Sequence, residues 1–291
     1  MFKTLLVPLF GQAGDKEALE LAYDVLGDEA GHINCLYVHD DAATIAASIQ
    51  TDAMGVPIAT PEFIAALNQE CAALKIRGRQ TFDRFCEAHR ISNAAPVASG
   101  GGHSTSWQEV NGGIVQGISR AAHCNDAVVL KRGPGFSEPT FVNIGKIAIA
   151  AGRPLLVFPD HWPHRPLRHI VIAWKDTPEA ARAVSSALPL LKKAKRILII
   201  SASESDNLQT TEESANACAA FLRGHGLQAE TRCIETKEED AEYQVFSEAV
   251  VAEADLFVMG TYGHSRVQEL IFGGFTRRAL QESAIPLLLM H

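Results

Sequence analysis

The chain has 291 residues, of which 47% are hydrophobic and 21% charged, a composition typical of a soluble globular protein of about two domains. Its formal net charge of -8 and the lack of a basic cluster exclude a general affinity for the nucleic-acid backbone. No apolar run approaches the ~20 residues that span a bilayer, and the six cysteines form no CxxC pair. We therefore expect a cytoplasmic protein without membrane or nucleic-acid partners.

Two stretches of the chain repeat one order of apolar runs and helical segments. The runs lie at 5–9, 33–38, 126–130 and 152–158 in the first stretch, and at 169–174, 196–200, 255–259 and 284–290 in the second. Continuous apolar runs that alternate with helices are typical of parallel strands buried on both faces. The sequence predicts an α/β fold of two Rossmann-like domains, each a roughly five-stranded parallel sheet flanked by helices.

The two copies differ in length, and a proline-rich linker separates them. Leu5 corresponds to Ile170 and Ala127 to Leu256, so the first copy holds 36 more residues between these points. We assign the excess to a helical insertion at about 40–69. The linker 159–166 contains three prolines, which exclude regular structure. The predicted domains are therefore 1–158 and 167–291.

Each predicted domain closes on a strand marked by a proline, Pro154 or Pro286. We expect both strands at a sheet edge, where unpaired backbone groups invite association unless another strand covers them. The corresponding edge of the other copy is the nearest cover, which predicts that the domains pack as a pseudo-dimer. Whether tandem chains pair again into a homodimer stays open.

Glycines cluster after the predicted strand 256–259. Gly260-Thr261-Tyr262-Gly263 follows the strand directly, and Gly273-Gly274-Phe275-Thr276 opens a second helical stretch nine residues later. Glycines let backbone amides surround phosphate oxygens, and a helix N-terminus attracts anions. The glycines are equally suited to tight turns around a short helix. Residue chemistry alone leaves a phosphate site and a set of turns as equal alternatives.

The spacing G-x2-G-x9-G, on Gly260, Gly263 and Gly273, resembles the ATP-binding signature of the universal stress protein family. The resemblance covers essentially the whole chain, and the tandem layout is similar to that of two-domain members. It implies a Rossmann-like fold, a role as a stress-response sensor or adaptor with unknown protein partners, and an adenine nucleotide as ligand, either ATP or a related molecule with Mg²⁺. The nucleotide-binding residues that it implies are Gly260, Thr261, Gly263, Gly273, Gly274, Phe275, Thr276, Ala173, Lys175 and Asp176.

Two positions depart from the family's pattern. Gly274 stands where the family has a serine or threonine, which removes a hydroxyl from the expected phosphate site. Lys175 stands at the family's acidic position after the first strand, and Asp176 follows one place later. Lys175 is equally suited to contacting a phosphate and to a solvated turn.

The matching loop of the first copy reads Lys131-Arg132-Gly133-Pro134-Gly135 and lacks the GxxG spacing. Pro134 removes an amide donor, and Phe10-Gly11 offers no carboxylate after the first strand. We expect solvated side chains at Lys131 and Arg132, and a structural role for this half. The stretch 100–104 is interpreted as a flexible connection between a strand at 94–98 and a helix.

No residue pair has the pattern of a catalytic acid and base, so we expect at most weak ATP hydrolysis. His264, Ser265 and Glu269 are the nearby candidates for a slow ATPase or nucleotidyl-transferring enzyme. A scaffold that binds no nucleotide is the third alternative. His161, His164 and His169 lie among prolines without a neighbouring cysteine, and we expect no metal site there.

Overall fold

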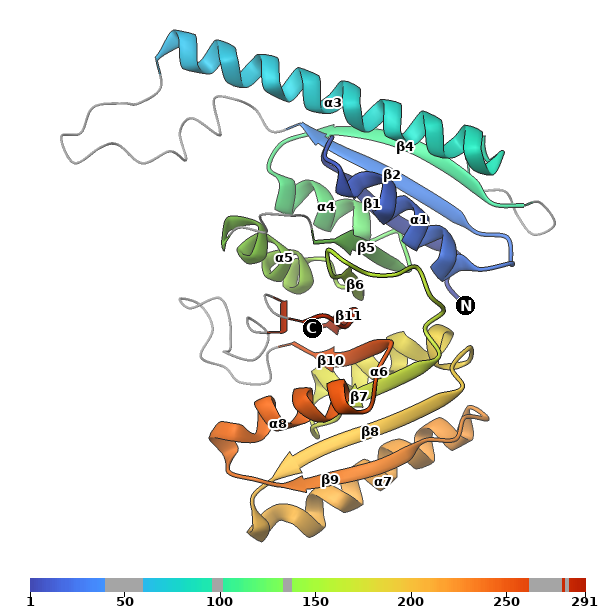
Figure 1. Cartoon of the computed structure of the whole chain (residues 1–291), viewed down its shortest axis with the longest axis vertical. Coiled ribbons are helices and arrows are strands. Elements are labelled where there is room, and N and C mark those ends of the chain that lie inside the picture. The colour runs from blue at the N-terminus through green and yellow to red at the C-terminus, as the bar shows by residue number, and fades with distance from the viewer. Residues whose placement is uncertain (40–59, 96–101, 133–137, 262–278, 281–282) are drawn as a thin grey trace. The chain divides into compact units, whose positions relative to one another are not determined.

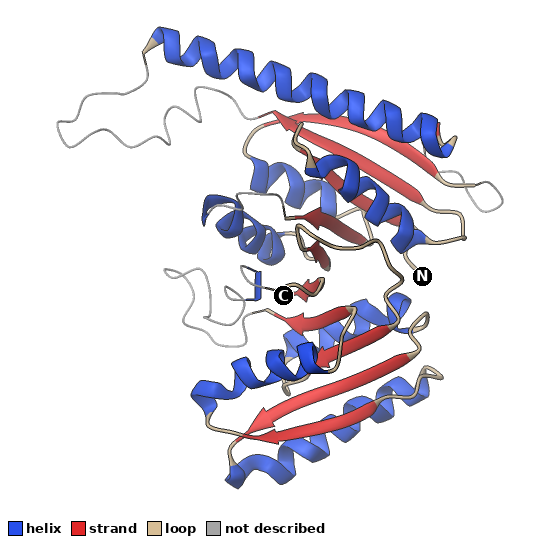
Figure 2. Cartoon of the chain, viewed as in Figure 1, coloured by secondary structure: helices blue, strands red, loops and turns tan. Residues whose placement is uncertain are grey.

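The computed structural model describes residues 1–39, 60–95, 102–132, 138–261, 279–280 and 283–291. Contacts between residues divide the chain into two compact units. One unit spans residues 2–129, and the other spans residues 130–291 with Met1. The strands and helices of each unit are shown in Figures 1 and 2.

The first unit is a parallel sheet with helices packed on it. Its strands run in the order β3-β4-β2-β1-β5, and every described pair is parallel. The elements are β1 (Thr4–Leu9), α1 (Gly14–Leu26), β2 (His32–His39), α3 (Pro61–His89), β3 (Ser92–Asn93), β4 (Ser104–Asn111), α4 (Ile114–Ala122) and β5 (Ala127–Lys131). Because right-handed crossovers lead outward from β1 to β4 and then back to β5, α4 lies on the face opposite α1 and α3.

The long helix α3 begins and ends at clear local signals. The Thr60 side chain caps the helix by accepting a hydrogen bond from the amide of Phe63 at 3.2 Å, and Pro61 occupies the first turn. Arg90 ends the helix in the left-handed region, with φ at 54°. Buried Phe82 and Phe85 anchor its C-terminal half. Residues 61–69 of the predicted helical insertion belong to this helix, and residues 40–59 lie outside the described part of the chain.

Strand β4 is where the sequence interpretation was wrong. The predicted connection 100–104 leads into a strand, Ser104–Asn111, and not into a helix, although Ser104, Thr105 and Ser106 are polar. Hydrogen bonds satisfy the hydroxyls of Ser104 and Ser106. The His32 ring lies 2.7 Å from the Ser104 hydroxyl and 3.0 Å from the Ser106 hydroxyl. Asn34 completes the network by accepting from Ser106 at 2.7 Å. Polar side chains of β4 can be buried because β2 supplies their hydrogen-bond partners. The sequence of β4 alone therefore lacks the apolar run by which the other strands were predicted.

The second unit is a six-stranded sheet in the order β6-β11-β10-β7-β8-β9. Its elements are α5 (Glu138–Ala150), β6 (Leu155–Phe158), β7 (His169–Ala173), α6 (Pro178–Leu191), β8 (Arg196–Ser203), a 3₁₀ turn η1 (Ser205–Asn207), α7 (Leu208–Gly224), β9 (Glu230–Glu235), α8 (Glu238–Val251), β10 (Leu256–Gly260) and β11 (Leu287–Met290). Its core strands β6, β7, β10 and β11 are buried along their central residues. This confirms the predicted runs of strand in the second half.

Strand β6 pairs with β11, the closing strand of the second copy. Leu155 lies opposite Leu289 and Val157 opposite Leu287, and the pair is antiparallel while the other described pairs of this sheet are parallel. The prediction that the two closing strands cover each other is therefore confirmed. Between β6 and β7, residues 159–168 contain neither helix nor strand. The domain boundaries predicted from the repeat stay a prediction.

The linker is fixed to the second unit by side chains. The ring of Trp162 is buried, and the Arg165 guanidinium lies 4.6 Å from its centre. Arg165 also forms an ion pair of 3.0 Å with Asp255, whose carboxylate accepts from the His169 amide at 2.8 Å. Among the described helices, none combines the length and apolar character that crossing a membrane requires.

Candidate functional site

The carboxyl ends of β7 and β10 lie side by side and bring the two predicted parts of the site together. Ala173 pairs with Met259, so Trp174, which follows β7, lies beside Gly260, the last residue of β10. Open parallel sheets bind ligands at this edge, where the amides and side chains of the loops converge. Ala173 therefore lies beside the end of β10, where the predicted glycine loop begins.

The turn after β7 is held in place from three sides. The Trp174 amide donates to the Ile200 carbonyl at 2.8 Å, and its indole Nε1 donates to Ser214 at 2.9 Å. The Trp174 carbonyl accepts from the buried Ser201 hydroxyl at 2.9 Å. Lys175 and Asp176 lie on this fixed turn with exposed side chains. They are available at the sheet edge, as a ligand-contacting position requires.

Helix α6 begins directly after this turn. The Thr177 side chain accepts from the Ala180 amide at 3.3 Å, and Pro178 stands at the first helical position. Arg182, one turn further, donates to Glu179 at 2.7 Å and to the His291 carbonyl at 2.9 Å. The start of α6 is thereby tied to the end of β11.

Gly260 has a packing role that the sequence did not reveal. A Cβ added at this position would lie 2.6 Å from the Ala180 amide nitrogen and 2.7 Å from the Glu179 carbonyl carbon. Real Cβ atoms do not approach backbone atoms so closely, and neither neighbour can move without shifting α6. Glycine at position 260 is therefore required by the helix that lies against it, whether or not a ligand binds.

Thr261 is the described residue that most directly indicates a missing partner. It is fully buried, its amide donates to the Met290 carbonyl at 2.8 Å, and its carbonyl lies 3.1 Å from His291 Nδ1. Its Oγ1 is buried without a hydrogen-bond partner among the described residues. A buried hydroxyl without a partner costs about 1–3 kcal/mol, so native structures usually satisfy it. The hydroxyl lies at the edge where the glycine loop begins.

The remaining predicted nucleotide residues lie outside the described part of the chain. They are Gly263, Gly273, Gly274, Phe275 and Thr276. The same applies to His264, Ser265 and Glu269, the candidates for catalysis. These assignments stay predictions from the sequence.

Arg132, at the matching loop of the first copy, is not the solvated side chain that the sequence suggested. It is half-buried, and its guanidinium donates to the Leu280 carbonyl at 2.7 Å and to the Ser283 carbonyl. Burial lowers its pKa from the ordinary value. Lys131 Nζ lies 3.4 Å from Asp160. Arg132 thus stabilises the chain segment that leads from the glycine loop to β11. No local sequence pattern predicts this interaction.

The first unit supplies a carboxylate to its own β1–α1 loop, although from a later residue than the sequence interpretation considered. Asp15 is buried and accepts from the Phe10 amide at 3.0 Å and the Gly11 amide at 2.7 Å. Burial raises its pKa to about 6, against the opposing effect of these hydrogen bonds. The carboxylate therefore satisfies the loop's own amides.

Helix α3 occupies the space directly over this loop. Gly11 has a φ of 70°, and a Cβ there would lie 2.0 Å from the Leu74 carbonyl oxygen. Gly78, one turn on, also faces the loop, but a Cβ there would meet the Gly11 nitrogen at 3.4 Å, an ordinary contact distance, so the close approach depends on Gly11. Backbone thus lies on backbone at the β1–α1 loop of the first unit. Among the described residues, no group of three or more histidine, cysteine or acidic side chains is arranged to hold a metal ion.

No protein-family model and no curated protein sequence matches the chain. Several solved structures, in contrast, are similar to it. A universal stress protein from Archaeoglobus fulgidus DSM 4304 is similar with a TM-score of 0.65 at 15% identity, over 99% of this chain and 95% of that one. A putative universal stress protein from Pseudomonas aeruginosa UCBPP-PA14 gives 0.55 at 16%, over 99% and 93%.

The same fold also occurs in another kind of protein. The cytoplasmic domain of a prokaryotic cation chloride cotransporter is similar with a TM-score of 0.51 at 13% identity, over 99% of this chain and 95% of that one. Identities this low establish the architecture and leave the ligand open. Over its full length, the chain has the α/β fold of the tandem universal stress proteins.

Proposed function

We propose that the second half of the chain binds an adenine nucleotide, ATP or a close relative accompanied by Mg²⁺, at the carboxyl ends of β7 and β10. The phosphates would lie against the glycine loop 260–276, and the nucleoside against Ala173 and the Lys175-Asp176 turn. Binding would make the protein a cytoplasmic stress-response sensor or adaptor whose partner contacts depend on occupancy.

The observation that carries the proposal is the buried hydroxyl of Thr261, which has no partner among the described residues. It lies where β10 ends, beside the turn that follows β7. A nucleotide oxygen at this edge would satisfy it, and exposed Lys175 would add a positive charge beside a phosphate. The G-x2-G-x9-G spacing that starts at the neighbouring residue supports the same ligand.

The decisive variant is Gly263→Val, measured by calorimetric titration with Mg-ATP. A Cβ at Gly263 would resist the loop conformation and fill space that a phosphate needs, so we expect ATP affinity to fall at least tenfold while the fold is kept. Gly224→Val is the matched control, because a Cβ at that helix end meets no atom within 4 Å. Unchanged ATP affinity in a folded Gly263→Val protein would show that the loop is only a turn.

Mass analysis of nucleotide released from denatured protein separates the proposal from its two alternatives. Retained ATP supports a binding protein that hydrolyses slowly or not at all. Retained ADP favours the slow ATPase. A purified protein that retains no nucleotide and gains no thermal stability from Mg-ATP favours the scaffold.

A further inference from the structure

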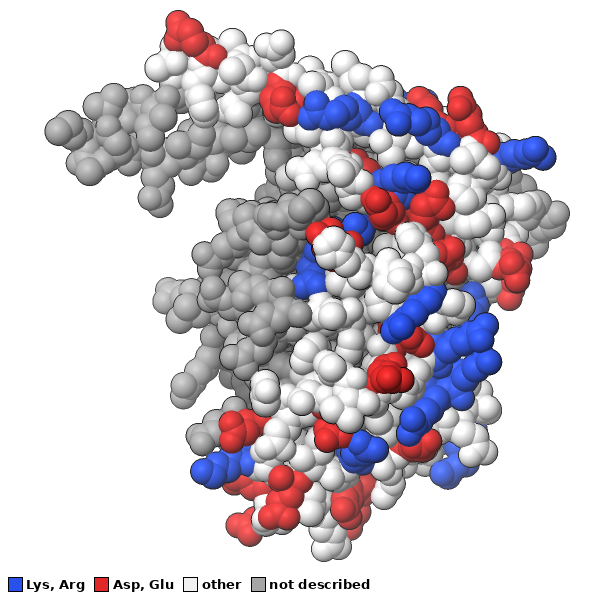
Figure 3. Space-filling view, in the orientation of Figure 1, with Lys and Arg blue, Asp and Glu red and all other residues white. Residues whose placement is uncertain are grey.

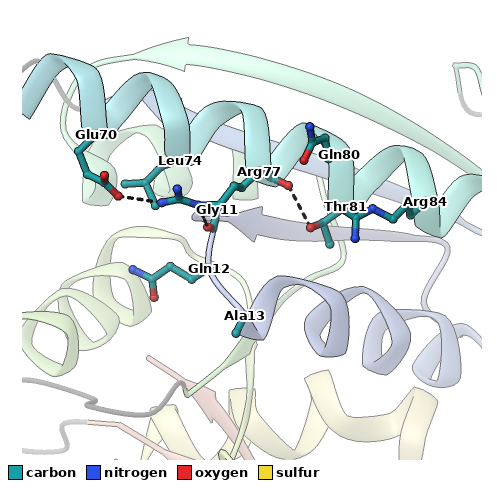
Figure 4. Close-up of a pocket in the computed structure, with 9 residues that line it drawn as sticks. All are labelled: Gly11, Gln12, Ala13, Glu70, Leu74, Arg77, Gln80, Thr81 and Arg84. Atoms are coloured by element: carbon teal, nitrogen blue, oxygen red, sulfur yellow. Dashed lines mark hydrogen bonds and ion pairs between the residues drawn. The ribbon is translucent and has the colours of Figure 1, made fainter.

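The first unit contains an open cleft between the β1–α1 loop and α3 (Figure 4). Its volume is about 540 Å³, which is in the range of small-molecule sites. The lining residues are Gly11, Gln12, Ala13, Glu70, Leu74, Arg77, Gln80, Thr81 and Arg84. All of them belong to the first unit, so this α3 cleft is separate from the nucleotide site proposed on β7 and β10.

The α3 cleft is lined by one face of the helix. Residues 70, 74, 77, 81 and 84 recur every three or four positions, the spacing of a single helical stripe. Such a stripe is normally apolar when it packs on a core, but here Leu74 is its single apolar member. Two arginines and a threonine take the other central positions. A polar stripe that faces a hollow is suited to binding a polar ligand rather than to packing.

The walls of the α3 cleft are held rigidly. Gly11 allows the loop backbone to lie against the backbone of α3, and Arg77 Nε donates to the Gly11 carbonyl at 3.2 Å. The other end of the Arg77 guanidinium donates to Glu70 at 2.7 Å. The Thr81 hydroxyl donates to the Arg77 carbonyl at 3.0 Å, which fixes the orientation of this side chain. A ligand would therefore meet a pre-formed surface.

The residues that line the α3 cleft carry more positive than negative charge, since Arg77 and Arg84 face the single acidic residue Glu70. Glu70 is paired with Arg77, whereas exposed Arg84 has no hydrogen bond or ion pair among the described residues. The exposed Gln12 and Gln80 amides add neutral donors. Helix α1 begins at the floor of the cleft, and its first turn carries Asp15 and Glu17. Because the Asp15 carboxylate is buried and accepts from the Phe10 and Gly11 amides, the two arginines of the cleft remain the groups that attract an anion. Figure 3 shows basic side chains interspersed with acidic ones along α3.

From this arrangement we infer that the α3 cleft binds a small oxyanionic molecule, either a phosphate ester or a polycarboxylate. The guanidinium of Arg84 contacts the oxyanion, Arg77 supports it from the next turn, and the glutamine amides contact the remainder of the ligand. Arginine suits both ligand types because its planar fork matches carboxylate and phosphate oxygens.

The test is calorimetric titration of the full chain with inorganic pyrophosphate and, separately, with citrate. We expect one of the two probes to bind, and Arg84→Gln to weaken its binding about tenfold, the effect of losing one charge-assisted hydrogen bond. Arg120→Gln is the matched control, because exposed Arg120 lies on α4 on the other face of the sheet. Pyrophosphate binding would identify a phosphate ligand and citrate binding a polycarboxylate.

Hydrogen exchange locates the bound probe. Peptides that cover 10–16 and 77–85 should be protected by the probe in the wild type and in Arg120→Gln, and lose that protection in Arg84→Gln. Failure of both probes to bind the wild type would overturn the inference. Equal weakening by the two substitutions, or protection confined to other peptides, would overturn it as well, because each indicates a general charge effect or a different site.

Discussion

At the residue scale, the glycines of the proposed nucleotide site have two different roles. Gly260 is required by the backbone of α6, whereas Gly263 and Gly273 are assigned to a ligand by spacing alone. The sequence signature does not distinguish these roles, because a missing Cβ serves close packing and phosphate approach equally well. The two roles predict different responses to substitution.

Gly260→Ala should destabilise the fold, since the added Cβ would lie 2.6 Å from the Ala180 nitrogen. We expect the free energy of unfolding to fall by about 1–3 kcal/mol, the usual cost of overpacking. Gly224→Ala, where a Cβ meets open space, should be neutral or slightly stabilising. Urea unfolding of both variants measures the difference. Equal stability of the two would mean that α6 does not constrain position 260.

Asp15 predicts a specific pH dependence. Burial raises its pKa to about 6 in the folded protein, against 3.8 ordinarily, so the folded state binds the proton more tightly than the unfolded state does. Its contribution to stability therefore increases as pH falls from about 6 towards 4, with a slope of at most ~1.4 kcal/mol per pH unit. Asp15→Ala lacks this proton-binding group and also leaves the Phe10 and Gly11 amides without their acceptor.

The measurement is urea unfolding of wild type and Asp15→Ala between pH 4 and 7. The wild type should be the more stable protein, and its advantage should increase towards the acid end. An advantage that shrinks steadily below pH 6 would contradict a raised pKa for this carboxyl.

At the element scale, apolar runs were sufficient to predict most of the strands, whereas polar elements were not. β4 was missed because its buried side chains are satisfied by His32 and Asn34 from another strand, a tertiary arrangement that the local pattern does not contain. Arg132 was misjudged for the same reason, since its acceptors lie about 150 residues away. Near the predicted site, the sequence predicted the strands β7 and β10, but the roles of Gly260 and Thr261 depend on α6 and β11, which the motif does not contain.

The pairing of β6 with β11 predicts how the second half behaves alone. A chain of residues 167–291 lacks β6 and exposes the edge of β11, whose Leu287, Leu288 and Leu289 pair with β6 in the full chain. Such an edge recruits another strand, so we expect dimers or aggregates in sedimentation velocity. Excess peptide of residues 153–160 should return the chain to monomers, and a scrambled peptide should not. A stable monomer without the peptide would show that the pairing is dispensable.

At the scale of the whole molecule, the two halves of the sequence have different tasks. The first half places α3 over its own β1–α1 loop and contributes β6 and Arg132 to the sheet and loop of the second unit. The second half retains the open turn after β7 and the glycine loop. One chain should therefore hold one nucleotide, although its two copies follow the same plan.

The stoichiometry of Mg-ATP binding to the intact chain tests this claim most directly. Titration calorimetry at known protein concentration should give one ATP per chain, and Gly263→Val should remove that site without a change in melting temperature. Two ATP molecules per chain in Arg84→Gln protein, or one that persists with full affinity in folded Gly263→Val protein, would contradict the assignment of the nucleotide to the glycine loop of the second half.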